Sequence, residues 1–260
     1  MQVKKILAVD FSELFFTSLH ACASMSRKGK SMPLEYMVFK KLFSYTKRNP
    51  GREVYLLCDG HGSKYWRKEV YPEYKGTRKA QREAVEDLDW PDLFARYAQM
   101  VSVIDTFTPM ECFREDSLEA DDLMAVLAKQ GHDLVIFCTD KDLNQLTIYN
   151  NVVLVSPKVK KVKDQFVVRQ IANPALELKK LIEKGDKSDN IPAARTEAQR
   201  IINNKIVNLV QLPEVIEARA TAVLAQPRVK NINIGAFCEV YSWDFCGIEL
   251  TKFVKDYPIQ

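Results

Sequence analysis

The segment SLEADDLMA, residues 117–125, places three carboxylates within four positions at the start of an apolar stretch: Glu119, Asp121 and Asp122. Like charges about 4 Å apart repel by roughly 1 kcal/mol in water, and by more in a drier site. Either a cation compensates this repulsion or the side chains point apart. On a helix, Glu119 and Asp122 share one face, while Asp121 is rotated by about 100°. One helix start can therefore serve two neighbouring ions.

The same segment is also typical of an ordinary helix N-terminus. Asp116 or Ser117 fits the N-cap, and Glu119 fits the position that reaches back in a capping box. Acidic side chains in a first turn are also stabilised by the helix macrodipole. This alternative needs no cation, and the segment alone does not decide between the two interpretations.

Three apolar, strand-like runs also end in aspartate: VKKILAVD (3–10), EVYLLCD (53–59) and DLVIFCTD (133–140). In a parallel sheet the carboxyl ends of the strands meet at one edge, where ligands bind. One aspartate at such a position is usually an N-cap, but turn chemistry alone does not account for three. The acids involved are Asp10, Asp59 and Asp140, with Asp142 two residues further on and Asp186 and Asp189 in the later segment GDKSDN.

These acids make up a set of nine candidate metal ligands: Asp10, Asp59, Glu119, Asp121, Asp122, Asp140, Asp142, Asp186 and Asp189. An all-oxygen ligand set suits Mg²⁺ or Mn²⁺. Zinc is disfavoured because the chain has only three histidines and no C-x-x-C pair. Two such ions about 3.5–4 Å apart can activate a water and stabilise the leaving oxygen in phosphodiester hydrolysis.

Charge is distributed unevenly along the chain. The net charge is only +4, but residues 64–82 carry seven Lys or Arg against two acids, and PKVKKVK (157–163) adds four lysines. A basic body around an acidic site is the pattern expected of a metal-dependent enzyme that acts on phosphates.

Composition bounds the class of protein. With 260 residues and 47% hydrophobic content, the chain can form one large domain or a domain with a small appendage. It contains no membrane-span-like run and no signal-peptide pattern. Six scattered cysteines, with Cys58 and Cys138 inside apolar runs, fit buried thiols in a reducing, cytoplasmic setting.

Strand-like and helical patterns alternate over the first part of the chain, which predicts an α/β fold with a central, mostly parallel sheet flanked by helices. A further strand is expected at 152–157, and helices at about 33–48, 79–102 and 117–130. After about residue 165 the pattern becomes helical, over 173–186 and 196–212. We therefore expect a core over 1–165 and a C-terminal helical region over 166–260.

Six ordered motifs resemble the 5′-nuclease family, a PIN-like group of flap endonucleases and 5′–3′ exonucleases with phage members: AVDFS (8–12), CDG (58–60), YPEYKGTRK (71–79), EADD (119–122), TDKDLNQL (139–146) and GDKSDNIP (185–192). They cover about residues 1–192. The resemblance implies a basic helical arch at about 64–90 and hydrolysis at DNA 5′ ends or 5′ flaps with two Mg²⁺ or Mn²⁺ ions.

The resemblance also implies roles for individual residues. A first metal would lie among Asp10, Asp59, Glu119, Asp121 and Asp122, and a second among Asp140, Asp142, Asp186 and Asp189. Lys75 and Arg78 would lie at the base of the arch against the scissile phosphate, acting in catalysis with Asp121. Tyr74 is expected to stack on a terminal base.

The remaining basic residues are expected to bind DNA less specifically. Five form an electrostatic surface near the arch: Lys64, Arg67, Lys68, Lys79 and Arg82. Arg195, Arg200 and Lys205 either contact phosphates or simply cover a helix surface. The KVKKVK run is interpreted first as an exposed sheet edge.

One feature departs from the family pattern. Between Gly185 and Gly235 the chain has no glycine, whereas the family places a glycine-bearing hairpin, the helix-three-turn-helix motif, after GD-x-x-DNIP. A backbone phosphate nest is harder to form without glycine. We therefore expect a remodelled element, which puts duplex binding through it, and any potassium site, in doubt.

Two other classes stay open: a DNA-structure-binding accessory protein with little or no catalysis, and a PIN-type ribonuclease. A binding-only descendant should have lost acids, and PIN ribonucleases usually lack the basic insertion and GDKSDN. Nucleotide-dependent enzymes are disfavoured because neither of the nucleotide-binding motifs G-x-x-x-x-G-K-[ST] and G-x-G-x-x-G occurs.

The expected partners are DNA with a free 5′ end or a 5′ flap, RNA/DNA hybrids, and replication proteins. We expect no membrane contact, a monomer, and the cytoplasm of a bacterial host if the protein is phage-encoded.

Overall fold

The computed structural model describes residues 2–26, 33–83, 88–156, 166–228 and 230–241. Its six strands form one sheet, in the order β3-β2-β1-β4-β5-β6. The strands are β1 (Lys5–Asp10), β2 (Glu53–Leu57), β3 (Glu111–Phe113), β4 (Asp133–Phe137), β5 (Val152–Ser156) and β6 (Val167–Val168). All neighbours pair in parallel except β5 and β6, which are antiparallel. The predicted α/β fold with a mostly parallel sheet is confirmed.

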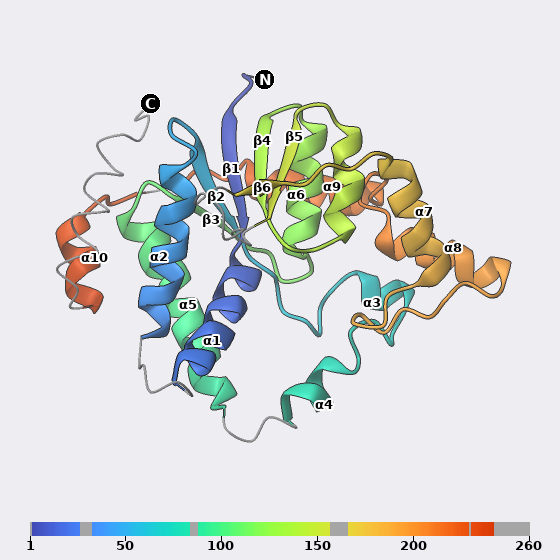
Figure 1. Ribbon diagram of the computed structural model, residues 1–260, viewed down its shortest axis with the longest axis horizontal. Helices are drawn as coiled ribbons and strands as arrows, with labels where there is room; N and C mark the ends of the chain where they lie inside the picture. Colours follow the sequence, from blue (N-terminus) through green and yellow to red (C-terminus); the bar gives the residue numbers. More distant parts are fainter. Residues whose placement is uncertain (1, 27–32, 84–87, 157–165, 229, 242–260) are drawn as a thin grey trace.

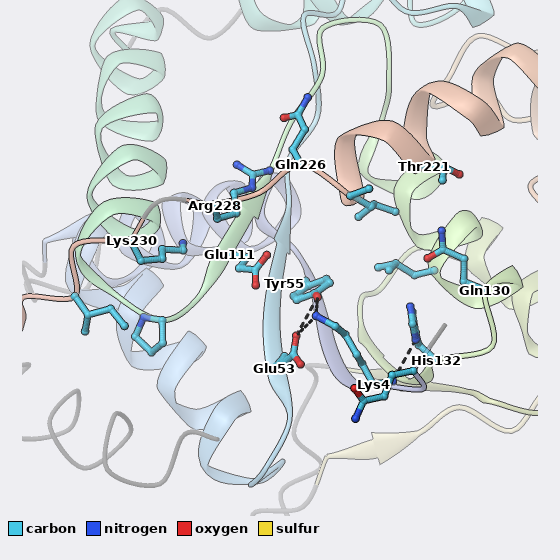
Figure 2. A pocket seen from close by; sticks show the side chains of 16 residues that line it. Lys4, Glu53, Tyr55, Glu111, Gln130, His132, Thr221, Gln226, Arg228 and Lys230 are labelled. Carbon is cyan, nitrogen blue, oxygen red and sulfur yellow. Dashed lines mark hydrogen bonds and ion pairs between the residues drawn. The ribbon is translucent and has the colours of Figure 1, made fainter. Parts of the chain in front are cut away.

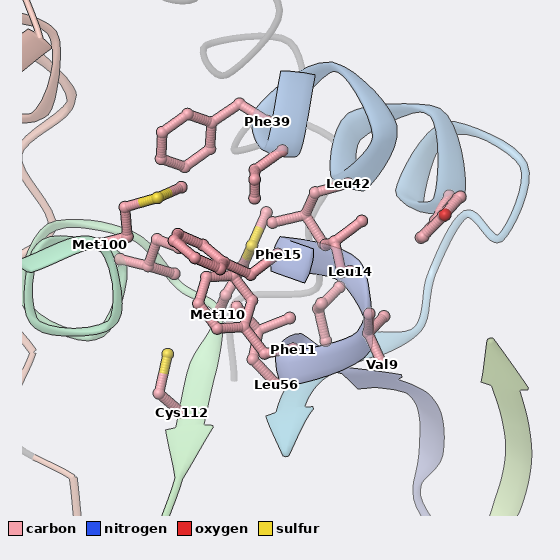
Figure 3. Packing of buried hydrophobic residues seen from close by; sticks show 14 of the residues in the cluster. Val9, Phe11, Leu14, Phe15, Phe39, Leu42, Leu56, Met100, Met110 and Cys112 are labelled. Carbon is pink, nitrogen blue, oxygen red and sulfur yellow. The ribbon is translucent and has the colours of Figure 1, made fainter. Parts of the chain in front are cut away.

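Both faces of the sheet are buried, because alternate residues of each strand point to opposite sides. In β1, Leu7 and Val9 pack under one layer of helices, whereas Ile6 and Ala8 pack under the other. The first layer contains α1 (Phe11–Ser26), α2 (Leu34–Lys47), α5 (Trp90–Phe107) and α10 (Ile234–Tyr241). The second contains α6 (Ala120–Lys129) and α9 (Glu214–Leu224), as Figure 1 shows. Figure 3 shows the aromatic and aliphatic side chains that fill the first layer.

The remaining elements are α3 (Arg67–Val70), α4 (Arg78–Glu83), the 3₁₀ helix η1 (Asp142–Ile148), α7 (Pro174–Lys184) and α8 (Glu197–Val207). Figure 1 shows α3, α7 and α8 at one end of the molecule. The helix α7 packs against both η1 and α8. Within the described ranges, every helix is too short or too polar to traverse a bilayer.

Several element boundaries differ from the prediction. The helical region expected near 79–102 contains two helices, α4 and α5, and residues 84–87 between them lie outside the described ranges. Asp89 caps α5 by accepting a hydrogen bond from Asp92 N at 3.0 Å, and Pro91 occupies its first turn. The helix expected over 117–130 begins at Ala120, so Glu119 is its N-cap residue and neither Asp116 nor Ser117 is.

Two short strands and one long helix were not predicted. The strands β3 and β6 have only three and two residues, too few for a periodic pattern. The helix α1 starts at Phe11, directly after Asp10 ends β1 and with no loop residue between them, so no turn signal separates the two elements. The KVKKVK run and residues 242–260 lie outside the described ranges.

The strand order places a topological switch beside β1. The chain moves from β1 outward through β2 to β3, and then crosses to β4 and β5 on the other side of β1. In open α/β sheets, ligands bind where the direction of strand order reverses, beyond the carboxyl ends of the strands. The carboxyl ends of β1 and β4 are therefore the place to look for a site.

A glycine allows two segments to approach each other at this end. Gly60 follows β2, and its N–H donates to Leu118 O at 2.9 Å. A Cβ at Gly60 would lie only 2.2 Å from Glu115 O and 2.5 Å from Asp116 O. This close approach fixes the loop before α6 against the end of β2.

We predict that Gly60→Ala destabilises the fold by about 1–3 kcal/mol, because the backbone of 115–116 must shift to accept the methyl group. Gly62→Ala is the matched control, since its Cβ would meet only the Tyr65 ring at 3.7 Å. Chemical denaturation of both variants measures the difference. Equal stability of the two variants would contradict the close approach.

Candidate active site

Acidic side chains gather at the carboxyl edge of the sheet. Asp10 ends β1, where it pairs with Leu57 of β2, and Val9 pairs with Phe137 of β4. Asp59 and Asp140 follow β2 and β4 by two and three residues. The first turn of α6 adds Asp121, and η1 begins with Asp142. Five acids predicted from the sequence therefore come from five different elements or loops to one edge.

The pKa values of these acids show that they interact. Burial raises the pKa of Asp10 well above its ordinary value, and the charges of Asp59 and Asp140 raise it further. Burial, then Asp140 and Asp10, raise the pKa of Asp121. Burial, then Asp140, Asp186 and Asp189, raise the pKa of Asp142 to about 7. Asp140 thus interacts with the acids on both sides.

None of these five acids has a cationic partner. Within the described ranges, none of Asp10, Asp59, Asp121, Asp140 and Asp142 forms an ion pair with a lysine or arginine. Asp10 accepts Glu13 N at 2.8 Å, and Asp140 accepts Asp142 N at 2.8 Å. In the described part of the chain, no three Asp, Glu, His or Cys side chains already form a group that could hold a metal ion. Carboxylates without a cation between them repel one another.

Two further predicted acids are paired with internal cations. Glu119 accepts hydrogen bonds from Arg67 Nη1 at 2.8 Å and from Lys75 Nζ. Burial acts to raise the pKa of Glu119, but the charges of Lys75 and Arg67 outweigh it and lower the pKa to about 2. Asp189 accepts Arg78 Nη2 at 2.6 Å, and the Tyr74 hydroxyl lies 2.9 Å from Glu119 Oε2 and 3.1 Å from Asp189 Oδ2.

Asp122 and Arg67 differ most from their predicted roles. Asp122 is 0% exposed, and its two oxygens accept hydrogen bonds from Arg67 at 2.8 and 3.0 Å. Its Oδ2 also accepts Trp66 Nε1 at 3.2 Å and Glu119 N at 2.9 Å. These bonds occupy its lone pairs, so Asp122 faces a guanidinium and not an open coordination site. Arg67, only 4% exposed, lies in the interior; its expected place on an exposed DNA-binding surface is wrong.

Arg67 also joins the helical region to the core. Its Nε donates to Ile206 O of α8 at 2.8 Å, while its other nitrogens bind Glu119 and Asp122. Gln145 of η1 adds a second connection, donating to Val207 O at 2.9 Å. The predicted boundary near residue 165 is therefore crossed by buried polar contacts.

The segment YPEYKGTRK (71–79) places the side chains of Lys75 and Arg78 beside the acidic group. Lys75 has a positive φ of 53°, and its N–H donates to Asp189 O at 2.9 Å. Asn190 Nδ2 donates to Glu73 O at 2.8 Å, which further fixes this segment to the 185–191 turn. Tyr74 is only 4% exposed, so its ring is not available to stack on a base as expected. Arg78 remains 45% exposed at its side chain.

The other predicted basic residues mostly lie on the surface. Lys64, Lys79 and Arg82 are exposed, and Lys68 is half-buried. Lys64 pairs with Asp116 at 2.5 Å and Lys79 with Glu83 at 3.8 Å. Their contact with DNA stays a prediction.

In the C-terminal part, Arg195 and Lys205 are exposed, and Arg200 is held by Glu183 at 2.9 Å and by Glu197. The turn before α8 is closed by hydrogen bonds between Asp186 and Ile191, at 2.9 and 2.7 Å. Gly185 and Asn190 both have positive φ there. From Ile191 to Arg228, by contrast, no residue has positive φ, in agreement with the absence of a glycine-bearing hairpin. Any role of this part in duplex binding is still a prediction.

Sequence reasoning missed Glu13 and Trp66. The Glu13 carboxylate accepts Thr139 N at 2.9 Å and Thr139 Oγ1 at 2.6 Å, which fixes the residue before Asp140. Glu13 follows Asp10 by three residues, a spacing that brings two side chains to the same side of a helix. This signal was not used, because α1 itself was not predicted. Trp66 donates to buried Asp122, and no spacing in the sequence indicates that contact.

A depression of about 610 Å³ lies at the amino ends of β1, β2 and β3, opposite the acidic edge (Figure 2). Here charges neutralise one another inside the protein. Lys4 Nζ binds Glu53 at 2.9 Å and the Tyr55 hydroxyl at 3.1 Å, and Lys230 Nζ binds Asp105 at 2.7 Å. The unneutralised acids distinguish the carboxyl edge, which we take as the candidate active site.

Comparison with known proteins identifies the family of the chain. A family model described as the 5′-3′ exonuclease, N-terminal resolvase-like domain matches residues 5–173, about two thirds of the chain. The chain belongs to this 5′-3′ exonuclease family. The matched range contains eight of the residues that form or flank the site: Asp10, Asp59, Tyr74, Lys75, Glu119, Asp121, Asp140 and Asp142. The expected family is thereby confirmed.

Named relatives include a phage protein and bacterial polymerases. The chain is 31% identical over 197 residues to ribonuclease H of Enterobacteria phage T4, covering 73% of this chain and 63% of that protein. It is 27% identical to DNA polymerase I of Rhizobium leguminosarum, covering 72% of this chain and 19% of the polymerase. The chain thus spans just under two thirds of the T4 protein and a small part of the polymerase.

Solved structures of phage T5 proteins share the fold. One, of the T5 5′-exonuclease with bound zinc ions, superposes with a TM-score of 0.57 at 19% identity, covering 97% of this chain and 98% of that one. Another, of the T5 D15 flap endonuclease in a pseudo-enzyme–product complex with DNA and metal ions, gives a TM-score of 0.53 at 18% identity, covering 97% of both chains.

We predict that the stability of the metal-free protein falls as pH rises from about 5 to 7.5. The folded-state pKa of Asp142 is raised to about 7, above the ordinary value of about 3.9 in an unfolded chain. The folded state therefore binds more protons between these values, and this stabilisation is lost as pH rises through 7, by up to about 1.4 kcal/mol per pH unit for each such group.

Urea denaturation in EDTA at several pH values measures this slope. Asp142→Asn should make the slope shallower, because the variant cannot lose that proton. Glu214→Gln, at an exposed position on α9, is the control and should leave the slope unchanged. An Asp142→Asn slope equal to that of the parent would contradict the prediction.

We also predict that Arg67→Ala costs about 3–5 kcal/mol of stability, because it leaves two buried carboxylates without their cation. Arg67→Lys should recover only part of the loss, since an ammonium cannot bind both acids and Ile206 O in the same fork geometry. Arg195→Ala, at an exposed position, should change stability by less than about 0.5 kcal/mol. Similar denaturation midpoints for the Arg67→Ala and Arg195→Ala variants would contradict this assignment.

Proposed function

We propose that this protein is a divalent-metal-dependent 5′-nuclease that hydrolyses phosphodiester bonds at DNA 5′ ends or 5′ flaps. The observation that carries the proposal is the group of five acids without an ion-pair partner, Asp10, Asp59, Asp121, Asp140 and Asp142, at the switch point of the sheet. Membership in a 5′-3′ exonuclease family supports this choice of reaction over other phosphate chemistry.

The donor set fits hard divalent cations. All its members are carboxylates, which suit Mg²⁺ or Mn²⁺. The raised pKa values of Asp10, Asp121 and Asp142 are what a site shows when nothing balances its negative charge. We assign Asp10, Asp59 and Asp121 to a first ion and Asp142, Asp186 and Asp189 to a second, with Asp140 between the two groups. When bound, two such ions supply an activated water and stabilise the leaving oxygen.

Other residues of the chain would position the substrate and the ligands. Lys75 and Arg78 already lie against Glu119 and Asp189 at the edge of the acidic group. Cations at that place favour charge that develops on a phosphate in the transition state. Asp122, held by Arg67 and Trp66, would orient the start of α6 and therefore Asp121, which follows Glu119 by two residues.

Relatives and neighbours support the substrate class. One T5 neighbour is described in complex with DNA and metal ions, and the T4 relative is named ribonuclease H. We therefore include the RNA strand of RNA/DNA hybrids, and so RNA primers, among the substrates to be tested. Relatives named DNA polymerase I support a replication setting. We further propose that the protein acts as a monomer in the host cytoplasm.

The test uses a 5′-labelled flap duplex and a matching blunt duplex, each with Mg²⁺, Mn²⁺ or EDTA. Cleavage should require the metal. Asp121→Asn should lower its rate at least about 100-fold, since even changes to outer-shell groups of metal sites cost 10–100-fold. Glu214→Gln, far from the acidic edge on α9, is the control for handling and folding.

Metal binding to the protein alone gives an independent measurement. Isothermal titration with Mn²⁺ should show weaker binding for Asp121→Asn than for the parent and the Glu214→Gln control. Tight DNA binding without cleavage in either metal would contradict the nuclease and support an accessory DNA-binding protein.

A further inference from the structure

Glu13, in the first turn of α1, connects two neighbouring strands of the candidate active site. Its backbone N–H donates to Asp10 Oδ1 at 2.8 Å, at the end of β1. Its side chain reaches the loop after β4, where Oε1 accepts Thr139 Oγ1 at 2.6 Å and both carboxylate oxygens accept Thr139 N at 2.9 Å. Thr139 directly precedes Asp140. One residue therefore contacts the acid that ends β1 and the segment that carries the acid after β4.

The side-chain contact of Glu13 is not the one that helix capping uses. A glutamate three residues after an N-cap residue ordinarily reaches back to the N–H of that residue in a capping box. The start of α6 shows this form, because Asp122 accepts Glu119 N at 2.9 Å. Glu13 has the same spacing from Asp10, but its carboxylate binds Thr139, 126 residues further along the chain. The Glu13 side chain thus holds the loop after β4.

A second residue holds the same loop. Arg169, which follows β6, donates from Nη1 to Asp140 O at 2.5 Å and from Nη2 to Asn144 Oδ1. The backbone of Thr139 and Asp140 is therefore bound both from α1 and from the antiparallel edge of the sheet. These bonds limit the movement of the backbone that carries the Asp140 carboxylate.

Asp10 and Asp140 share a pattern of contacts. The Oδ1 atom of each accepts a backbone N–H from the following turn: Glu13 N for Asp10 and Asp142 N for Asp140, both at 2.8 Å. In the described part of the chain, neither Oδ2 atom has a hydrogen-bond partner. Each carboxylate is thus oriented through one oxygen and offers the other to a cation. Carboxylates that bind metals are commonly held by such hydrogen bonds from outside the ligand set.

Glu13 adds a negative charge beside acids that already repel one another. Burial and the charge of Asp59 raise the pKa of Asp10, and the charge of Glu13 acts in the same direction. A glutamine could accept both Thr139 hydrogen bonds through its single oxygen without this repulsion. Hydrogen bonds to a carboxylate, however, are shorter and roughly twice as strong as those between neutral groups. The glutamate therefore holds Thr139 more firmly at a cost in repulsion, as expected where the geometry of a neighbouring site matters.

We propose that Glu13 is a positioning residue for metal binding: its backbone holds Asp10 and its side chain holds Thr139, so the Asp10 and Asp140 carboxylates keep a set separation. Glu13 itself stays outside the ligand set, because Thr139 occupies its carboxylate. The inference rests on the proposed nuclease function. It deepens that function by naming a residue that determines how well the ligands bind their cations.

The test measures Mn²⁺ binding without DNA, by isothermal titration and by the electron paramagnetic resonance signal of the free ion. Glu13→Ala removes the contact with Thr139 and should weaken Mn²⁺ binding about 10–100-fold, the usual effect of losing an outer-shell partner. Glu13→Gln keeps an acceptor for Thr139 and should weaken it by no more than about 5-fold, equivalent to one ordinary hydrogen bond. Glu214→Gln on α9 is the matched control and should bind as the parent does.

A double-mutant cycle shows whether Glu13 acts through Thr139. Thr139→Val removes the Oγ1 donor at nearly constant volume and should weaken Mn²⁺ binding about 5-fold or more in the parent. In the Glu13→Ala background it should have little further effect, because the contact is already lost. Urea denaturation in EDTA shows whether each variant is folded. Glu13→Gln should unfold at a urea concentration equal to or above that of the parent, because it removes a charge beside Asp10.

Three results would overturn the proposal: parent-like Mn²⁺ affinity in Glu13→Ala, equal weakening by the Ala and Gln variants, or additive effects of Glu13→Ala and Thr139→Val. If Glu13→Ala does not fold, parent-like affinity in Thr139→Val overturns it instead. A parent protein that binds no Mn²⁺ would contradict the proposed function together with this inference. Metal-dependent cleavage by the parent, with Mn²⁺ binding unaffected by Glu13→Ala, would contradict this inference alone.

Discussion

Repulsion among carboxylates at the carboxyl edge of the sheet is the constraint on which the rest of the site depends. The parallel register and the short loops after β1, β2 and β4 bring Asp10, Asp59 and Asp140 together, and α6 and η1 add more acids. The chain meets this constraint in two ways. Acids nearest the arch and the 185–191 turn receive internal cations, whereas those at the switch point receive none.

The internal cations also hold separate parts of the chain together. Arg67 binds the first turn of α6 and the last turn of α8, and Lys75 and Arg78 bind Glu119 and Asp189. Buried ion pairs give little net stability compared with apolar packing, but they fix geometry because an unpaired member is costly. The arrangement of the 66–78 segment, of α6 and of the 185–206 region is therefore a single electrostatic unit. A shift in one of them would disturb the carboxylates of the others.

The strand ends were predictable from the sequence, because a buried strand and the acid that follows it leave a local pattern. Helical spacing also placed Glu119 and Asp122 correctly on one face. What spacing did not provide was the identity of the cation on that face, which is Arg67 from a segment some fifty residues earlier. Arg67 was expected among the basic residues of a DNA-binding surface, and Tyr74 was expected to stack on a terminal base. Tertiary contacts with α6, α8 and Asp189 bury them instead, and no local pattern encodes those contacts.

Some acids at this edge form ion pairs with internal cations and others form none. This difference favours a site that binds metal cations over a site that is acidic without binding them. Desolvated carboxylates with raised pKa values destabilise the fold at neutral pH. Asparagine would remove that cost at Asp10, Asp121 or Asp142 while keeping similar shape and hydrogen-bonding capacity. The chain could also have placed a lysine there, as it does with Lys75 beside Glu119. Divalent ions would offset the cost and would add stability in proportion to the logarithm of their concentration over Kd. Functional sites are where proteins retain such strain, and the five acids without an ion-pair partner are the clearest instance of it in the described part of this chain.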